Sequence, residues 1–225
     1  MDDSKNILEK AQDIYQILYQ QYGEPEWRYP YPAIDELVST ILSQNTNDRN
    51  RDIAFEQLKT RFPTWEMVRD APSEEVIEAV RTAGLANQKG PRIQKVLNQI
   101  SEERGEISLD YMKTMESDEV MEKLLSYKGV GKKTASIVMQ FSLGLPAFPV
   151  DTHIHRISGR LGLRPEKMTA DQAHDHLAQL FDPDTYGPAH LNIIRLGREI
   201  CHARKPDCAS CLLQQHCKYY QNNKY

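Results

Sequence analysis

Two glycines near the middle of the chain most constrain how it can fold. The triplet Gly129-Val130-Gly131 separates two stretches with helical periodicity, residues 117–127 and 133–143. Because glycines allow a tight turn with positive φ, the triplet predicts a short hairpin between two helices. Backbone N–H groups at the start of the second helix would then face outward and favour an anion such as a phosphate. Taken alone, the motif is also compatible with an ordinary turn between two helices.

The rest of the chain repeats this helical pattern. Apolar residues recur at spacings of three and four, and proline, glycine and capping residues separate the segments. No alternating segment of useful length predicts a β-strand, so we expect an all-α protein. Helices are expected over residues 4–22, 32–45, a segment containing Ile53 and Phe62, 64–70, 73–82, a segment ending near 104, 117–127, 133–143, 152–161, 170–181 and 189–201.

The net charge of the chain argues only weakly against binding to nucleic acid. The formal net charge is −4, whereas proteins that bind duplex DNA usually show a basic footprint. The distribution matters more, because Asp151 is the only acidic residue between Ser126 and Arg164. A basic face on an acidic body can still hold DNA, although a solvated helix face is the simpler explanation for a run of charges.

The composition indicates a globular protein without a membrane span. The chain has 225 residues, 40% of them hydrophobic, which suffices for one large or two small cored domains. No apolar run approaches the roughly 18 residues that a span needs. The N-terminus, MDDSKN, is acidic rather than a basic signal region. We therefore expect a soluble intracellular protein.

All four cysteines lie close together near the C-terminus. Cys201, Cys208, Cys211 and Cys217 follow the spacing C-x6-C-x2-C-x5-C within seventeen residues. Without a secretory signal, this spacing favours a metal over disulfides. Zinc usually takes two close pairs of ligands, and only one CxxC is present. A 4Fe-4S cluster needs four converging thiolates, which a compact loop can supply. Spacing alone favours iron–sulfur, with zinc and inert thiols as alternatives.

Two motifs together closely resemble the endonuclease III family of helix-hairpin-helix DNA glycosylases. One is the cysteine segment LGREICHARKPDCASCLLQQHCKYY, and the other is the pair of Lys133 and Asp151, eighteen residues apart. The resemblance covers nearly the whole chain. It implies the helix-hairpin-helix glycosylase fold, with two helical domains and the active site in the cleft between them. We expect residues 26–145 to form the hairpin domain, and residues 1–25 with 146–225 to form the cluster domain.

The resemblance also implies a cofactor and a DNA contact near the C-terminus. In that family the cysteine segment carries a 4Fe-4S cluster, so the four cysteines are the expected ligands. The loop between the first two cysteines carries basic residues to the DNA backbone in the family. Arg204 and Lys205 match that loop.

By the same resemblance, Lys133 is the expected nucleophile and Asp151 the catalytic carboxylate. Base release builds positive charge on the deoxyribose, which an ionised carboxylate would stabilise. A neutral lysine amine can attack C1′, expel the base and leave a Schiff base that permits β-elimination. Positive charge on Lys128 and Lys132 favours the neutral amine. Considered without the family, Asp151 would be only an N-cap of the helix at 152–161, and Lys133 a phosphate contact.

A glycosylase must also extrude its target base from the duplex and fill the gap. Leu85, in AGLANQK, matches the family's wedge leucine, and Asn45, beside Gln44, falls where the family usually has a glutamine. Lys128 replaces the family's usual proline before the hairpin and would add a phosphate contact, whereas Asn45 leaves the preferred opposite base open. The expected DNA contacts are Gln44, Asn45, Leu85, Gly129, Val130, Gly131, Lys132, Arg204 and Lys205.

The sequence therefore predicts a base-excision-repair DNA glycosylase with AP-lyase activity. Its expected partner is duplex DNA that contains a damaged base or an abasic site. Oxidised pyrimidines such as thymine glycol are the expected substrates. We expect a cytoplasmic, nucleoid-associated monomer. One alternative on the same fold is a mismatch or uracil glycosylase, but such relatives often lack the lysine that Lys133 supplies. An alternative of another class is a non-catalytic DNA-binding iron–sulfur module.

Overall fold

The computed structural model of the protein describes residues 2–27 and 31–223, and these residues contain helices and connecting turns but no β-strand. The expectation of an all-α protein is therefore confirmed. The chain divides into two compact units. Unit 1 consists of Met1–Arg28 and Pro146–Tyr225, and unit 2 consists of Tyr29–Leu145. Each unit is described below by itself.

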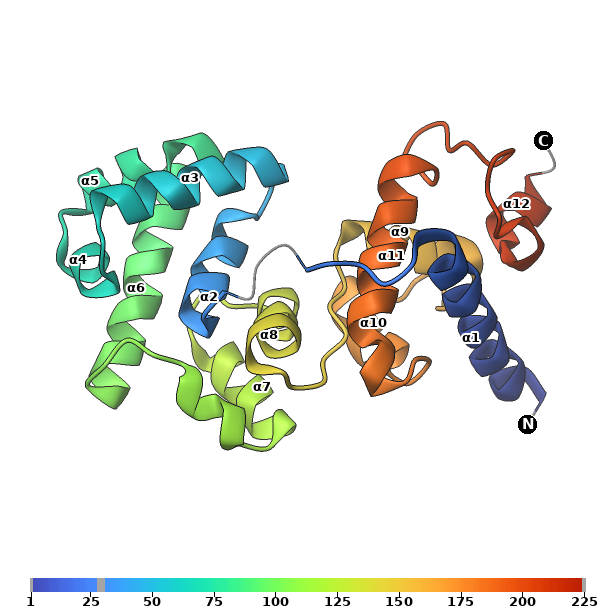
Figure 1. Ribbon diagram of the computed structural model, residues 1–225, viewed down its shortest axis with the longest axis horizontal. Coiled ribbons are helices and arrows are strands. Elements are labelled where there is room, and N and C mark those ends of the chain that lie inside the picture. The colour runs from blue at the N-terminus through green and yellow to red at the C-terminus, as the bar shows by residue number, and fades with distance from the viewer. Residues whose placement is uncertain (1, 28–30, 224–225) are drawn as a thin grey trace. The chain divides into compact units, whose positions relative to one another are not determined.

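Unit 2 is built around one long helix, α6 (Ala86–Arg104). Helices α2, α4 and α5 pack against α6, and α2 also packs against α8 (Figure 1). The helix α8 continues into a π-helical turn, η3. The other elements of the unit are α2 (Ala33–Leu42), α3 (Asp48–Arg61), α4 (Trp65–Asp70), α5 (Ser73–Ala79), η1 (Arg81–Ala83), η2 (Asp110–Thr114), α7 (Ser117–Ser126), α8 (Lys132–Val138) and η3 (Met139–Leu143).

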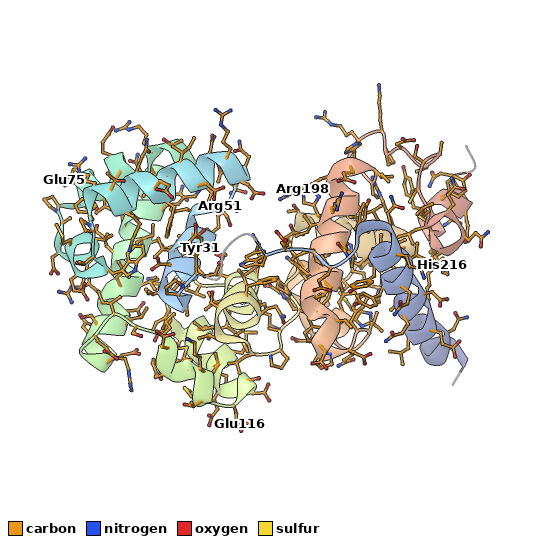
Figure 2. All side chains as sticks on the ribbon, viewed as in Figure 1. Tyr31, Arg51, Glu75, Glu116, Arg198 and His216 are labelled. Atoms are coloured by element: carbon orange, nitrogen blue, oxygen red, sulfur yellow. The ribbon has the colours of Figure 1, made fainter. Side chains whose placement is uncertain are left out.

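The core of unit 2 comes from apolar residues at helical spacing. On α6 the buried face includes Ile93, Leu97 and Ile100, each fully buried. Side chains fill the space between the helices, as Figure 2 shows. Arg51 of α3, labelled there, is buried except for 4% of its surface and pairs with Asp48 at 2.7 Å. A buried guanidinium is thus compensated by a carboxylate of its own helix.

Unit 1 joins the two ends of the chain. The helix α1 (Asp2–Tyr22) lies against α11 (Tyr186–Glu199), although the two are far apart in the sequence (Figure 1). Within the core, Phe148 stacks on Phe181 with ring centroids 5.1 Å apart and meets Tyr186 edge-on. The other elements are α9 (Thr152–Leu161), α10 (Ala170–Ala178), η4 (Pro183–Thr185), η5 (Gln214–His216) and α12 (Lys218–Asn222).

Several predicted helix ends are confirmed and others are wrong by a few residues. Gly23, with φ of 73°, ends α1 as expected. The helix predicted over 32–45 ends at Leu42, because the chain then turns and Asn45 adopts a positive φ. The helix predicted from residue 189 begins at Tyr186, since a proline within the first turn needs no donor there. The pattern of capping residues fails at α5, because Pro72 precedes this helix without a side-chain cap.

Among the residues that the structure describes, none of the helices combines the length and the apolar character that crossing a membrane requires.

The α6 core predicts a sharp difference between two leucine truncations in unit 2. Leu97→Ala removes a fully buried side chain, so the free energy of unfolding should fall by about 2–5 kcal/mol. Leu125→Ala on α7, where the leucine is 36% exposed, is the matched control and should cost less than about 1 kcal/mol. Urea denaturation of the two variants measures both values, and equal losses would contradict a core centred on α6.

Candidate active site and metal centre

The hairpin at residues 128–131 depends on one of its two glycines. Gly129 has φ of +100°, and a Cβ there would lie 2.7 Å from Cδ of Arg92. Gly131 has an ordinary φ of −103°, and no heavy atom would lie within 4 Å of its Cβ. The expectation that both glycines supply positive φ is therefore wrong for Gly131. The bare backbone at Gly131 leaves open space at the start of α8.

Val130 closes the turn from inside. Its side chain is 6% exposed, and its N–H donates a hydrogen bond of 3.0 Å to the carbonyl of Tyr127. The N–H of Val130, which is among the expected DNA contacts, therefore points into the turn. This residue holds the hairpin shut, whereas the exposed Gly131 directly precedes α8 without a side-chain cap.

Lys132 and Lys133 occupy the first turn of α8, as the sequence predicts for the helix that follows the hairpin. Both side chains are half-buried. The next residues of the helix, 134–138, are all buried. The two lysines therefore mark the point where α8 emerges from the core of unit 2, and the predicted role of Lys133 in catalysis stays a prediction at this point.

Asp151 begins α9, as its sequence context predicts. Its Oδ1 accepts a hydrogen bond of 2.8 Å from the N–H of Ile154, which fixes one oxygen of the carboxylate. The backbone just before it is also held, because Nδ1–H of the buried His190 donates to the carbonyl of Pro149 at 2.9 Å. Asp151 is half-buried. These two hydrogen bonds set its position from its own helix and from α11.

Three residues that the sequence links to DNA share a strained backbone. Asn45, Leu85 and Lys205 have φ of 52°, 51° and 51°, and they are the non-glycine residues with positive φ in the described part of the chain. This conformation is uncommon for side chains other than Asn or Asp and costs free energy. Leu85 is also a large apolar residue with 46% of its surface exposed. All three belong to the DNA contacts expected from sequence.

The sequence interpretation missed Lys89, which is buried to 1% exposure in the second turn of α6. Its Nζ donates hydrogen bonds to the carbonyl of Leu42 at 2.7 Å and to that of Ala83 at 2.8 Å. Burial lowers the pKa of Lys89 to about 8, and the positive charge of Arg92 adds to that shift. The helical spacing of Lys89 to buried Ile93 could have revealed it, because that spacing places the lysine on the core face.

Two further α6 side chains, also missed, reach the hairpin. Arg92 donates from Nη1 to Oε1 of Gln44 at 2.6 Å, and its aliphatic part lies directly beneath Gly129. Gln99 accepts the N–H of Lys128 with its Oε1 at 3.0 Å. One face of α6 thus contacts the segment with Gln44, the turn before Leu85 and the hairpin.

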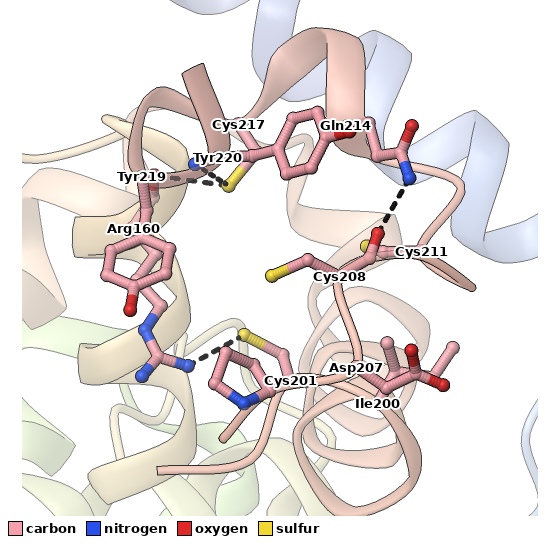
Figure 3. Close-up of a pocket in the computed structure, with 11 residues that line it drawn as sticks. Arg160, Ile200, Cys201, Asp207, Cys208, Cys211, Gln214, Cys217, Tyr219 and Tyr220 are labelled. Carbon is pink, nitrogen blue, oxygen red and sulfur yellow. Dashed lines mark hydrogen bonds between the residues drawn. The ribbon is translucent and has the colours of Figure 1, made fainter. Parts of the chain in front are cut away.

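The four cysteines of unit 1 line a single pocket, whose wall also includes Arg160. Figure 3 shows the sulfurs of Cys201, Cys208 and Cys217 turned into this pocket. All four are free thiols. Burial raises the pKa of the Cys211 and Cys208 thiols, so four thiolates here need compensating positive charge.

The donor set of this pocket suits a soft metal or an iron–sulfur group. Within the described ranges 2–27 and 31–223, no three His, Cys, Asp or Glu side chains gather closely enough to hold a single ion. The four thiols are distributed around one pocket instead. That distribution is compatible with a cubane, in which each of four irons takes one thiolate.

Arg160 of α9 ties the cysteine pocket to the basic loop beside it. Its Nη1 donates to Sγ of Cys201 at 3.2 Å and to the carbonyl of His202 at 2.7 Å, and Nη2 donates to the carbonyl of Ala203 at 3.0 Å. Arg204 and Lys205 follow directly and are exposed. The loop that carries them is therefore anchored through an arginine that also contacts a cysteine sulfur.

Comparison with known proteins supports the family resemblance that the sequence motifs indicate. The sequence profile of the HhH-GPD superfamily base excision DNA repair proteins matches residues 38–183. Endonuclease III of Thermotoga maritima is 34% identical over 185 residues, which is 82% of each chain. The structure of a non-covalent endonuclease III–DNA complex superposes with a TM-score of 0.82 at 24% identity, covering 96% of this chain and 97% of that one. A trapped endonuclease III–DNA covalent intermediate gives 0.81 at 25% identity, covering 94% and 97%.

The fold and the matched residues define a helix-hairpin-helix protein of base excision DNA repair. Within that class, the chain belongs to the endonuclease III family. The matched range includes Gln44, Leu85, the hairpin, Lys133 and Asp151, whereas the four cysteines lie beyond it.

The unequal glycines of the hairpin predict unequal effects of the same substitution. Gly129→Ala places a methyl group against Arg92 at a positive φ, so the free energy of unfolding should fall by about 1–3 kcal/mol. Gly131→Ala meets open space at an ordinary φ and should change it by less than about 0.5 kcal/mol. Urea denaturation compares the two, and a larger loss for Gly131→Ala would refute this account of the turn.

Proposed function

We propose that Lys133 and Asp151 carry out the chemistry of a base-excision DNA glycosylase with AP-lyase activity. Membership in the endonuclease III family makes the protein an enzyme of this class. The observation that carries the assignment of residues is the place of each: Lys133 lies in the first turn after the hairpin, and Asp151 caps α9. Both positions match the family motif read from the sequence.

In this proposal the Nζ amine of Lys133 attacks C1′ of the deoxyribose, and the bond between C1′ and the base breaks. The departing base takes the electron pair of that bond and is protonated. Loss of a proton from the amine and opening of the sugar give a Schiff base at C1′. Removal of a proton from C2′ then eliminates the 3′ phosphate.

Asp151 stabilises the positive charge that develops on the sugar as the base leaves. Its Oδ1 is committed to the N–H of Ile154 at 2.8 Å, so Oδ2 is the oxygen that we assign to the sugar and to the amine proton. Anchoring one oxygen in the helix cap keeps the carboxylate in one orientation, which avoids reorganisation when the charge develops.

Leu85 and Asn45, two of the three non-glycine residues with positive φ in the described chain, serve extrusion of the base. Leu85 is the wedge that enters the base stack, and Gln44 with Asn45 occupies the space that the extruded nucleotide leaves. The exposure of Leu85 and the positive φ of Leu85 and Asn45 support these roles, because strain tends to be kept where function requires it. Lys132, the hairpin, Arg204 and Lys205 bind the phosphate backbone.

The substrate that we propose is duplex DNA with an oxidised pyrimidine or an abasic site, bound by one copy of the protein at the nucleoid. Lys133 favours this class over a mismatch or uracil glycosylase, because only the lyase step requires the amine. The same lysine counts against a non-catalytic DNA-binding module. Release of free base from a lesion duplex separates an enzyme from such a module.

A 4Fe-4S cluster held by Cys201, Cys208, Cys211 and Cys217 completes the proposal. Its support is that four thiols line one pocket and that their flanking sequence resembles the family's cluster segment. Zinc would need the sulfurs about 2.3 Å from one atom, whereas a cubane accepts thiolates spread around a pocket. When bound, the cluster supplies the positive iron charge that neutralises the thiolates and cross-links the loop.

Borohydride trapping on duplexes with thymine glycol, uracil or an abasic site tests the nucleophile. Wild type should form a covalent adduct, which Lys133→Ala should abolish because no amine remains to form the Schiff base. Lys132→Ala is the matched control from the same helical turn and should keep the adduct while binding DNA more weakly. An adduct of undiminished yield in Lys133→Ala would remove this lysine from the mechanism.

Asp151→Asn keeps the side-chain oxygen that caps α9 but removes the charge. Base release should therefore slow by roughly 10²- to 10³-fold, the usual loss for one group that stabilises transition-state charge. Single-turnover base release measures the rate, and circular dichroism checks that α9 remains folded. Base release at the wild-type rate would contradict the role of Asp151.

Metal analysis of the purified protein tests the cluster. Wild type should contain about four iron atoms per chain and absorb visible light through thiolate-to-iron charge transfer. Cys208→Ser should lose most of that iron, whereas Ser210→Ala, two residues away and on the same exposed loop, should keep it. One zinc per chain and no visible absorbance would overturn the assignment.

A further inference from the structure

One buried ammonium group joins the two segments to which the proposed function assigns base extrusion. Nζ of Lys89 donates to the carbonyl of Leu42 at 2.7 Å and to the carbonyl of Ala83 at 2.8 Å. Leu42 is the last residue of α2, and Ala83 is the last residue of η1. Carbonyl groups at helix ends lack partners within their helix and attract a cation.

Each of these carbonyls stands just before one of the strained residues. Asn45 follows Leu42 by three residues, and Leu85 follows Ala83 by two. On the other side of Leu85 the chain is held by the first backbone bond of α6, in which the Lys89 N–H donates to the carbonyl of Leu85 at 3.0 Å. The single residue Lys89 therefore fixes the chain on both sides of Leu85 and at the start of the segment with Asn45.

The environment of Lys89 shows that this arrangement is specific. Its side chain is 1% exposed, although a buried ammonium costs free energy unless it is fully hydrogen-bonded. An apolar residue would fill the same place in a helix core without that cost. The charged group facing it is Arg92, one turn further along α6, whose guanidinium is engaged by Gln44 at 2.6 Å. Lys89 and Arg92 thus act on the same segment from one helix face.

We propose that Lys89 is a positioning residue that couples residues 43–47 to residues 84–85, so that Leu85 and the Gln44–Asn45 pair enter the base stack in fixed register. The inference rests on the proposed function for the roles of these residues in extrusion, but the coupling itself is a property of the folded chain. Base extrusion requires both segments at once, because the wedge and the group that fills the gap act on one nucleotide.

Lys89→Met tests the coupling, since methionine keeps an unbranched side chain, one atom shorter, and removes both hydrogen bonds. Hydrogen exchange of the full-length protein without DNA should show amides of residues 43–47 and 84–88 exchanging at least about 10-fold faster in the variant. Amides of the core helix stretch 93–100 should exchange as in wild type. Unchanged exchange in either segment, or faster exchange throughout unit 2, overturns the proposal.

A kinetic comparison separates positioning from a general structural role. Excision of thymine glycol from a duplex requires extrusion, whereas borohydride trapping at a preformed abasic site has no base to extrude. Lys89→Met should slow single-turnover excision by roughly 10- to 100-fold, as misplacement of positioning groups does, and change the trapping rate by less than about 3-fold. Equal losses in both assays would contradict the proposal.

A milder variant guards against loss of folding. Lys89→Gln retains a donor, so its excision rate should fall between those of wild type and Lys89→Met, with accelerated exchange in the same two segments. Excision by Lys89→Gln at or below the Lys89→Met rate would count against a hydrogen-bonding role. Wild type that neither excises a base nor forms an adduct refutes the proposed function, whereas hydrogen exchange still decides the coupling.

Discussion

Unit 2 depends on hydrogen bonds that α6 makes to segments remote in the sequence. A buried ammonium bridges the ends of α2 and η1, and Arg92 and Gln99 carry the same helix face to Gln44 and the hairpin. Each hydrogen bond to a charged group contributes roughly 1.5–3 kcal/mol to stability. Removing one partner leaves the other buried group without a hydrogen bond, which costs free energy. These bonds therefore fix the relative positions of the segment with Gln44, the turn before Leu85 and the hairpin.

The strained backbone becomes understandable on this scaffold. A positive φ at Leu85 costs about 1–3 kcal/mol and persists only where the surroundings over-determine it. Lys89 supplies that determination on either side of Leu85, and α6 begins directly after it. Leu85 keeps 46% of its surface exposed in this position, which is consistent with the wedge role that we propose for it.

The sequence predicted what is local and missed what is long-range. Helical periodicity, the glycine stop after Tyr22 and the cap at Asp151 follow from neighbouring residues, and the structure confirms them. The two hydrogen bonds of Lys89 span 47 and 6 residues. A lysine within a helix is normally expected to face solvent, and only its spacing of four residues from the buried Ile93 indicates otherwise. The second hairpin glycine was misread because a motif cannot distinguish positive φ from room for an approaching partner.

The two glycines of the hairpin therefore have different structural reasons. The fold requires Gly129, since any side chain there would collide with Arg92. The N–H of the buried Val130 donates the hydrogen bond that closes the turn. Gly131 is required by nothing inside unit 2, because a Cβ would meet open space at an ordinary φ. The missing side chain leaves room at the start of α8, where we propose that a DNA phosphate binds. One glycine is therefore explained by the fold, and the other by the phosphate contact that we propose.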